Sequence, residues 1–425
     1  MSLKDVKGAV FEVAPLLMIK KESAMGSAFK ISEVIKEKSG MKRLTLTDFR
    51  NYESLRLEFD ICPIVMTGKN GSGKTNILEA VSFLSPGRGL RGAKMADIRR
   101  LNASQGLARG VLWAVSANVQ KNDEDYVLST AVQKSEKEGQ NDVHSFERRT
   151  VLIDGQKATT QAELGKYFSA IWLTPQMDRI FLGGPQPRRS FLDRMVYAFD
   201  LEHAKRTATF EHLYKEWYRI IKSGRSDNLW LLGLEEQMAA VGVSIAAARR
   251  ELVARLNTFT KNEPDDVFPD VMLALDGKIE QMLDENAAID VEDFYKQNLY
   301  ESRTNVFSGD GVEGVNKTDF KVFDKKKQMP AELCSTGEQK LLLISIILAQ
   351  TKCQMLDKGF APVLLLDEVT AHLDGIKRNA LLEKIKELRL QAFITATDEQ
   401  IFKALKNEAQ FFEVKSGVVL EKSRG

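Results

Sequence analysis

One short segment constrains this chain more than any other feature: positions 68–75 read Gly-Lys-Asn-Gly-Ser-Gly-Lys-Thr. The segment follows an apolar run at 61–67 and precedes a helix-forming stretch that begins at Asn76. A glycine-rich turn between a strand and a helix directs backbone N–H groups and the positive end of the helix dipole toward one point, where they bind phosphate. The pattern is that of a Walker A loop, and the alternative is a glycine-rich surface turn.

The Walker A pattern assigns separate parts to its residues. Backbone amides cradle the phosphates, the Lys74 ammonium reaches the β- and γ-phosphate oxygens, and the Thr75 hydroxyl can hold Mg²⁺. The loop therefore predicts ATP and Mg²⁺ as cofactors. The nucleotide-binding residues expected from it are Gly68, Lys69, Asn70, Gly71, Ser72, Gly73, Lys74, Thr75 and Asn76.

A second apolar segment, Ala-Pro-Val-Leu-Leu-Leu at 361–366, lies far along the chain. It shows no alternation, which predicts a strand buried on both faces of a parallel sheet. Asp367 and Glu368 follow directly, at the end of the strand where ligands bind in open α/β sheets. We expect Asp367 to hold Mg²⁺, mainly through a water, and Glu368 to polarise the water that attacks the γ-phosphate. The alternative is an acidic pair that only favours the dipole of the following helix.

A third segment, Leu-Cys-Ser-Thr-Gly-Glu-Gln-Lys at 333–340, precedes a strongly apolar helical run. Ser335 is a suitable N-cap, and Glu338 three residues later would complete a capping box. Ser-x-Gly-x-Gln at the start of a helix, before the strand that ends in Asp367, also resembles the signature loop of ABC-type ATPases. That resemblance implies that Ser335 and Gly337 bind the γ-phosphate held by a second subunit, so that ATP joins a homodimer.

Two segments after Glu368 agree with the same class. Positions 371–374 read Ala-His-Leu-Asp and resemble the D-loop, which runs along the dimer seam. Positions 393–398 read Phe-Ile-Thr-Ala-Thr-Asp and predict the next strand. Thr397 and Asp398 stand where transporters carry a switch histidine, so the phosphate-sensing role of that histidine is not transferred to this chain.

The separation of the motifs excludes the transporters. Residue 335 lies 267 positions after residue 68 (335 − 68 = 267), several times more than a transporter nucleotide-binding domain is expected to allow. No run of 18 or more apolar residues predicts a membrane span. The interval also lacks the long heptad array that SMC-type proteins require.

Other segments narrow the family within the SMC/RecF group of ABC-type ATPases. The opening segment 41–53 alternates like an edge strand and resembles the first strand of that group. Together with further matches it is similar to the RecF family of bacterial recombination and gap-repair ATPases over about residues 41–412. Lys317-Thr318 stands where that family usually carries His-Arg, so no role of that pair is transferred. The further matching segments are 87–93, 172–178, 184–193 and 314–320.

The resemblance implies a function in DNA repair. It implies ATP-driven dimerisation on double-stranded DNA beside single-stranded gaps or junctions, slow DNA-stimulated ATP hydrolysis, RecA loading together with RecO and RecR, and support of SOS induction. It also adds Arg50 and Asn51 to the nucleotide site and Gln176 to the metal ligands. Another SMC-like or overcoming-lysogeny-type repair ATPase, or a scaffold stabilised by ATP with incidental hydrolysis, remain alternatives.

The expected fold is an α/β P-loop ATPase head, with a mixed sheet and flanking helices, into which a mainly helical arm is inserted. Apolar residues repeat at helical spacing from 210 to 221 and from 238 to 259, which predicts packing helices in the arm. Residues 110–155 predict strands, with a polar loop at 134–142 and a turn at Asp154-Gly155. The expected divisions are an N-terminal extension at 1–40, head residues 41–183, arm residues 184–305 and head residues 306–425.

Composition bounds the compartment and the mode of DNA binding. Three cysteines show neither paired nor metal-ligand spacing, and residues 1–40 form a poor secretory signal, so we expect a cytoplasmic protein with an extended tail. The net charge is only +2, so DNA binding requires a local basic patch that reads backbone or junction shape. Solvated faces are the alternative for each candidate cluster. The clusters are Arg88, Arg91, Lys94, Arg99 and Arg100; Arg188, Arg189 and Arg194; and Arg249, Arg250 and Arg255.

Overall fold

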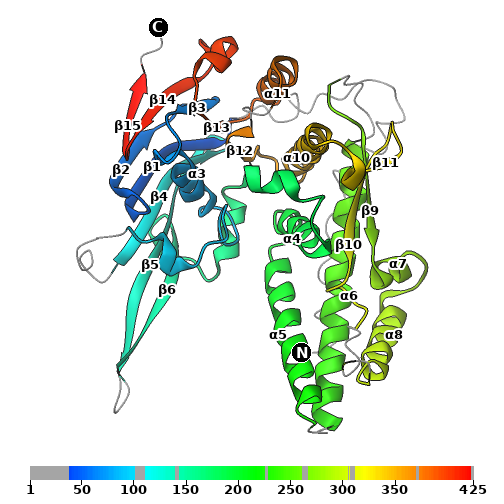
Figure 1. Ribbon diagram of the computed structural model, residues 1–425. Coiled ribbons are helices and arrows are strands. Elements are labelled where there is room, and N and C mark those ends of the chain that lie inside the picture. The colour runs from blue at the N-terminus through cyan, green and yellow to red at the C-terminus, as the bar shows by residue number, and fades with distance from the viewer. Residues whose placement is uncertain are drawn as a thin grey trace.

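The structure is a computed structural model, and it shows a sheet-rich head from which long helices extend (Figure 1). Most of the expected N-terminal extension lies outside the described residues. The residues described are 38–100, 111–138, 143–224, 228–260, 267–304, 306, 312–369 and 373–422.

The central sheet combines strands from both ends of the sequence. Its order is β15-β14-β3-β13-β12-β8, and all neighbouring pairs are parallel except the hairpin β14–β15. Every residue of β12 is buried between two parallel neighbours, as its unbroken apolar sequence predicts. The strands are β3 (Ile64–Thr67), β8 (Ala170–Leu173), β12 (Val363–Leu366), β13 (Ala392–Ala396), β14 (Gln410–Lys415) and β15 (Val418–Lys422).

A second, antiparallel sheet has the order β2-β1-β4-β5-β6-β7. The predicted turn at Asp154-Gly155 is confirmed, because both residues have positive φ, 49° and 76°, between β6 and β7. The strands are β1 (Gly40–Phe49), β2 (Tyr52–Glu58), β4 (Val111–Lys121), β5 (Glu124–Glu138), β6 (Val143–Ile153) and β7 (Gln156–Lys157).

Two expectations for this sheet are wrong. The opening strand β1 is not an edge strand, since β2 and β4 pair with it on either side. Alternation reports which face of a strand is buried and not whether the strand has lateral partners. The polar loop expected at 134–142 is also shorter, because backbone pairing continues from Lys134↔Glu147 to Glu138↔Val143. A polar composition does not prevent backbone pairing in a ribbon.

Helices cover the central sheet and form the arm. A third, small sheet of order β11-β10-β9 lies beside them. Its strands are β9 (Val271–Asp276), β10 (Asp319–Asp324) and β11 (Met329–Pro330). The α-helices are α3 (Lys74–Ser82), α4 (Pro185–Val196), α5 (His203–Lys222), α6 (Asn228–Phe259), α7 (Lys278–Glu285), α8 (Ala288–Glu301), α10 (Thr336–Lys358) and α11 (Gly375–Glu387). Short 3-10 helices span Met95–Ile98, Gln161–Lys166, Pro175–Arg179, Ala331–Leu333 and Gln400–Leu405.

The apolar side chains form two cores. The larger core joins the sheets of the head with α3, α10, α4 and the last turns of α6. The smaller core lies in the arm between α5, α6, α7 and α8. Phe210, Leu213, Trp217 and Ile221 are buried in it, which confirms that this stripe packs. The exact division between head and arm stays a prediction.

Helix α6 is long and apolar enough to cross a membrane by length and composition, and among the described residues it alone passes that test. Half of its apolar window is buried inside the protein. It also carries Glu235 and Arg249, both buried and both in ion pairs. A core helix of a globular protein has these same properties, so α6 is weak evidence for a membrane span.

Candidate nucleotide site

The loop at 68–73 runs from the end of β3 to the first residue of α3, as the Walker A pattern predicts. Gly68 and Gly73 have φ of 154° and 116°, a region that side chains disfavour. Space also excludes a side chain there. A Cβ on Gly68 would lie 2.2 Å from the Val414 carbonyl oxygen, and one on Gly73 would lie 2.5 Å from the Tyr52 hydroxyl. The loop therefore requires glycine at both positions.

Lys74 is buried and lies over its own loop. Its Nζ donates hydrogen bonds of 2.6 Å to the Gly68 carbonyl and 3.0 Å to the Lys69 carbonyl. Burial lowers the pKa of Lys74, while the Glu368 and Asp367 carboxylates act in the opposite direction and raise it. The ammonium thus bonds to neutral carbonyl oxygens within reach of two carboxylates, and phosphate oxygens are stronger acceptors of the same kind of bond.

The structure brings the loop and the acidic strand end together. The Thr75 hydroxyl donates to Asp367 Oδ1 at 2.9 Å and lies 3.1 Å from Oδ2. The contact forms because β3, β13 and β12 are parallel neighbours whose carboxyl ends share one edge of the sheet. Lys74, Thr75, Asp367 and Glu368 therefore meet at one place, although the sequence separates them widely.

One residue at this edge was not expected from the sequence. Thr395, fully buried in β13, donates from Oγ1 to Asp367 Oδ1 at 2.7 Å. Thr395 Oγ1 also accepts a hydrogen bond from the backbone N–H of Glu368 at 2.9 Å. The available signal was a hydroxyl in the strand predicted at 393–398, but the order of the strands was needed to place it beside Asp367.

Gln176 lies in the segment that follows β8, near this edge of the sheet. It is exposed in the turn Pro175–Arg179, which follows β8. Strand β8 pairs with β12, with Leu173 opposite Leu366, so the turn begins beside the strand end that carries Asp367. The role of Gln176 as a metal ligand stays a prediction.

Arg50 and Asn51 lie beside the first turns of α3. Arg50 forms two hydrogen bonds to the fully buried Glu79 carboxylate, at 2.7 Å and 2.8 Å. The Asn51 side-chain oxygen accepts from the Asn76 amide at 2.7 Å. Arg91 joins the same group, with Nη1 2.9 Å from Asn76 Oδ1 and 3.2 Å from Glu79 Oε2. Glu79 was not expected from the sequence, because no pattern in the neighbouring residues identifies the arginines with which it pairs.

The signature segment forms the helix start that its sequence predicts. Ser335 is the N-cap of α10, and the capping box with Glu338 is complete. The Ser335 hydroxyl and backbone N–H each lie 2.8 Å from Glu338 Oε2. Lys327 pairs with Glu338, and this pairing with the bonds from Ser335 lowers the pKa of Glu338 to about 2. Gly337 is exposed, and a Cβ there would meet no atom within 4 Å.

The segments after Glu368 are described in part. Residues 371 and 372 of the expected D-loop lie outside the described residues. Asp374 caps α11 by accepting the Lys377 N–H at 2.9 Å. The strand predicted at 393–398 is confirmed as β13. Asp398 accepts the Gln400 N–H at 2.8 Å and so begins the following turn, while Thr397 is exposed.

In the second and third candidate basic clusters, Arg188 and Arg249 are buried, so these two residues lie neither on a DNA surface nor on a solvated face. Arg188 is buried and pairs through two 2.7 Å bonds with Asp319. Arg194 is half-buried with its guanidinium over the Trp172 ring, and desolvation lowers the pKa of Arg194 to about 10. Their partners come from distant segments, which local charge counting does not reveal. Of the first cluster, Arg88, Arg91 and Lys94 are exposed.

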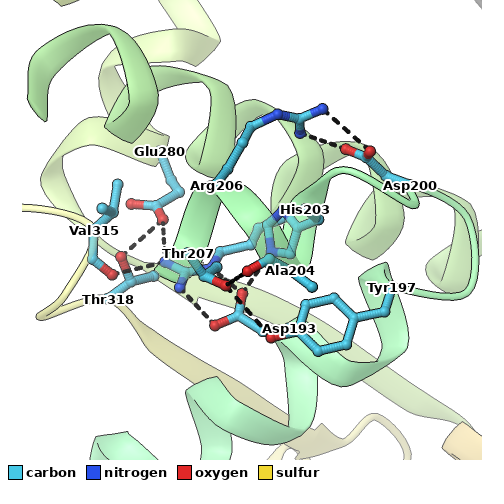
Figure 2. Close-up of polar contacts among 11 residues, drawn as sticks. Asp193, Tyr197, Asp200, His203, Ala204, Arg206, Thr207, Glu280, Val315 and Thr318 are labelled. Carbon is cyan, nitrogen blue, oxygen red and sulfur yellow. Dashed lines mark hydrogen bonds and ion pairs between the residues drawn. The ribbon is translucent and has the colours of Figure 1, made fainter. Parts of the chain in front are cut away.

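Arg249, in the third cluster, belongs to a buried polar network between the helices at the base of the arm. Its guanidinium bonds to both Asp193 oxygens at 2.8 Å and 2.9 Å, to Glu280 at 3.4 Å and to the Val315 carbonyl at 2.7 Å. Figure 2 shows Asp193, Glu280 and Val315 converging there from different segments, with His203 beside Asp193. Burial by itself raises the pKa of Asp193, but the Arg249 and His203 charges and hydrogen bonds outweigh it and hold the value at about 2.

Comparisons with known proteins agree with this geometry. The family described as the RecF/RecN/SMC N terminal domain matches residues 40–419. The DNA replication and repair protein RecF of Allorhizobium ampelinum is 42% identical over 384 residues, which cover 90% of this chain and 98% of that protein. RecF of Agrobacterium fabrum is 41% identical over 382 residues, 89% of this chain and 98% of that protein.

Solved structures show the same fold. The recombination mediator protein RecF of the RecFOR pathway, in a complex designated RecF-ATPrS, has a TM-score of 0.77 at 20% identity and covers 91% of this chain and 99% of its own. The corresponding RecF-ATP structure has a TM-score of 0.75 at 20% identity, covering 91% and 98%. At this identity the likeness establishes the α/β ATPase fold with its inserted helical arm.

Proposed function

This chain belongs to the RecF family of DNA replication and repair proteins, and from that membership we propose that it is an ATPase that binds DNA in recombinational gap repair. One observation carries the ATPase part of the proposal. Thr75 of the glycine loop and Asp367 of the acidic strand end are hydrogen-bonded at one edge of the central sheet, with Lys74 and Glu368 adjacent in sequence. A Walker A loop without this second strand end would explain phosphate binding only.

The residues present fit MgATP. Positive φ at the loop glycines permits the tight turn that a phosphate-binding loop needs, and Lys74 supplies a positive charge. Thr75 and Asp367 are the residues that would hold Mg²⁺, with Gln176 as a further ligand. When bound, the metal neutralises charge on the phosphate oxygens. The Glu368 carboxylate is not one of the proposed metal ligands. It orients a water molecule and accepts a proton from it.

Hydrolysis in this proposal requires a second copy of the chain. Gly337 is exposed, and within the part of the chain that the structure describes no atom lies close enough to exclude a side chain there. Glycine has a lower helix propensity than alanine, by up to about 1 kcal/mol, so its presence as the second residue of α10 is explained if the γ-phosphate on another subunit approaches it. Ser335 beside it is exposed as well. We therefore assign Ser335 and Gly337 to the nucleotide bound by the partner.

Exposed apolar side chains support such an interface. Leu333 precedes the signature serine and is 72% exposed, and Ile376 follows the D-loop and is 75% exposed. Leu182 follows the Gln176 turn and is 56% exposed. Each stands next to a motif that an ATP-joined dimer places at its seam, where burial of apolar surface would stabilise the closed state.

DNA and the pathway proteins are the proposed partners. Closure of two heads doubles the positive charge near a duplex beside a gap or its single strand, and Arg88, Arg91 and Lys94 are the exposed candidates. Arg91, between them, connects this loop to α3. By reciprocity, ATP that favours the dimer also favours DNA, and DNA favours ATP binding. With RecO and RecR as partners, the cytoplasmic protein would assist RecA loading and support SOS induction.

Sedimentation of the full chain tests this function. We expect monomers without nucleotide and with ADP, dimers with ATP, and a larger complex with ATP and gapped duplex. Lys74→Ala is the control, and it should stay monomeric under all conditions. Dimers of equal stability with ADP, or a monomer at saturating ATP, would contradict the proposal. Single-turnover hydrolysis with and without DNA separates it from a scaffold, for which DNA should not change the rate.

A further inference from the structure

We propose that Thr395 is a positioning residue that orients both acids of the hydrolytic site at once. The proposal rests on the ATPase function above and adds a residue that the nucleotide motifs do not include. Thr395 is not assigned to the nucleotide, and it acts through its hydrogen bonds to Asp367 and Glu368.

The strand order explains why this position reaches both acids. Strand β13 lies between β3, which carries the glycine loop, and β12, which carries the acids. Leu366 pairs with Ile394 in the parallel register, so the next residues along the two strands, Asp367 and Thr395, are neighbours. On its other side Thr395 pairs with Met66, near the end of β3.

The two bonds of the Thr395 hydroxyl are compatible and have a defined direction. A hydroxyl carries one hydrogen and two acceptor lone pairs. An ionised carboxylate only accepts, so the hydrogen points to Asp367 Oδ1 at 2.7 Å. A lone pair remains for the Glu368 backbone N–H at 2.9 Å. One side chain therefore locks the Asp367 carboxylate and the Glu368 backbone together.

The backbone at Glu368 needs such an anchor. Its φ is 52°, in the left-handed region that costs a residue with a side chain free energy. Such conformations persist where the surroundings fix them, and they concentrate at functional sites. The Thr395 hydroxyl accepts the N–H of this strained residue. Since φ at Glu368 sets the direction in which the chain leaves β12, the bond also sets where the Glu368 carboxylate lies.

The Thr395–Asp367 hydrogen bond should also remain when the Thr75–Asp367 hydrogen bond is lost. In this structure Asp367 Oδ1 accepts from both Thr75, at 2.9 Å, and Thr395, at 2.7 Å. The proposed function assigns the Thr75 hydroxyl to Mg²⁺ when nucleotide is present. Thr395, which is fully buried and remote from solvent, is then the side-chain donor that still holds Asp367. Its branched Cβ limits rotation of the hydroxyl, which serine would not.

The test compares Thr395→Val, which keeps the shape and removes the hydroxyl, with Thr395→Ser, which keeps the hydroxyl. We expect Thr395→Val to bind ATP within about threefold of wild type, to lose at least tenfold in the single-turnover rate, and to need a higher Mg²⁺ concentration for half-maximal hydrolysis. Thr395→Ser should recover most of the rate and the Mg²⁺ dependence. A role in packing alone would lower the fraction of active sites, measured by ATP titration, and leave the Mg²⁺ dependence unchanged.

Every other outcome contradicts either the role of Thr395 or the proposed function. A Thr395→Val protein with wild-type rate and Mg²⁺ dependence overturns the proposal, and so does an equal loss in Thr395→Val and Thr395→Ser. If Thr395→Val is not recovered folded, Thr395→Ala removes the hydroxyl without added bulk and carries the same expectation. Absence of hydrolysis by the wild-type chain would instead contradict the proposed function itself.

Discussion

Thr75 and Asp367 lie 292 positions apart and are joined by a 2.9 Å hydrogen bond from the threonine hydroxyl to the carboxylate. The bond connects the first turn of α3 to the end of β12. The threonine comes from one end of the chain and the acid from the other, so the site exists only when both parts of the head fold together. Variants in this site, in the signature segment at 333–340 and at the base of the arm should therefore differ in their effects on ATP hydrolysis, dimerisation and stability.

Glu368→Gln should separate binding from hydrolysis. The change removes the carboxylate that we propose accepts a proton from water, and it leaves Thr75 and Asp367 unaltered. ATP should bind and not turn over, so the closed dimer should accumulate, as measured by sedimentation with ATP and a radiolabelled hydrolysis assay. Combination with Lys74→Ala, which removes binding, is the control and should return the protein to monomers. A Glu368→Gln protein that stays monomeric at saturating ATP would exclude the ATP-joined dimer.

Ser335→Arg should show whether the signature serine acts on its own chain or on a partner. As a helix cap alone, its loss should lower the free energy of unfolding by about 1 kcal/mol and leave dimerisation unchanged. If the serine completes the partner's site, the monomer should bind ATP as wild type does, while dimerisation, hydrolysis and tight DNA binding fall together. Equilibrium denaturation and nucleotide titration measure the two effects separately.

Mixing Ser335→Arg with Lys74→Ala chains sharpens the same prediction. In the mixed dimer one composite site carries both defects, and the other combines an intact glycine loop with an intact signature segment. Partial recovery of hydrolysis in the mixture supports completion by the partner. No recovery, despite heterodimers demonstrated by differently tagged chains, would mean that both sites must be intact or that Ser335 acts within its own chain.

Gly337→Ala should have opposite effects on stability and on activity. A Cβ at this exposed position meets no atom of the described residues within 4 Å, so alanine should stabilise the monomer by up to about 1 kcal/mol through helix propensity. If the partner's γ-phosphate approaches the Gly337 amide, the added methyl group should weaken ATP-driven dimerisation. Urea denaturation and sedimentation measure the two quantities. A stabilised chain with unchanged dimerisation would show that Gly337 is not part of the composite site.

Asp193→Asn should destabilise the protein in a pH-dependent way. The change leaves the buried Arg249 guanidinium without its main partner, which should cost about 3 kcal/mol at neutral pH. The pKa of Asp193 is held at about 2, below the unfolded value of about 3.9. Its stabilising contribution is therefore fully present above the unfolded pKa and is lost as pH falls from about 4 through about 2. The difference in unfolding free energy between wild type and variant should shrink in that window.

Asp200→Asn is the matched control for Asp193→Asn, and Figure 2 shows both acids. Asp200 pairs with Arg206, and both side chains are partly exposed. Loss of that pair should cost less than about 1 kcal/mol. Urea denaturation of the three proteins at neutral and acidic pH measures the costs. Equal losses of unfolding free energy in the two variants would show that the buried network at the base of the arm contributes no more to stability than the partly exposed pair.

The sequence by itself determined the features that depend on neighbours along the chain. The glycine loop and the capping box of Ser335 and Glu338 were predicted because each is a pattern of residues close together in the sequence. The buried strand before Asp367 was predicted from its unbroken apolar run, although the strands that pair with it, β8 and β13, are distant in sequence. Local patterns also identified the arm helices from their apolar spacing. The resemblance, rather than local chemistry, supplied Arg50, Asn51 and Gln176.

Only the tertiary structure decided which distant groups meet. Thr395 and Asp367 belong to different strands, and Arg188 pairs with an acid 131 positions away. The charge of Arg249 suggested a surface, yet the residue is buried because Asp193, 56 positions earlier, is placed against it. A charged or polar side chain is stable in the interior only with a partner, and a sequence does not show which partner folding will bring.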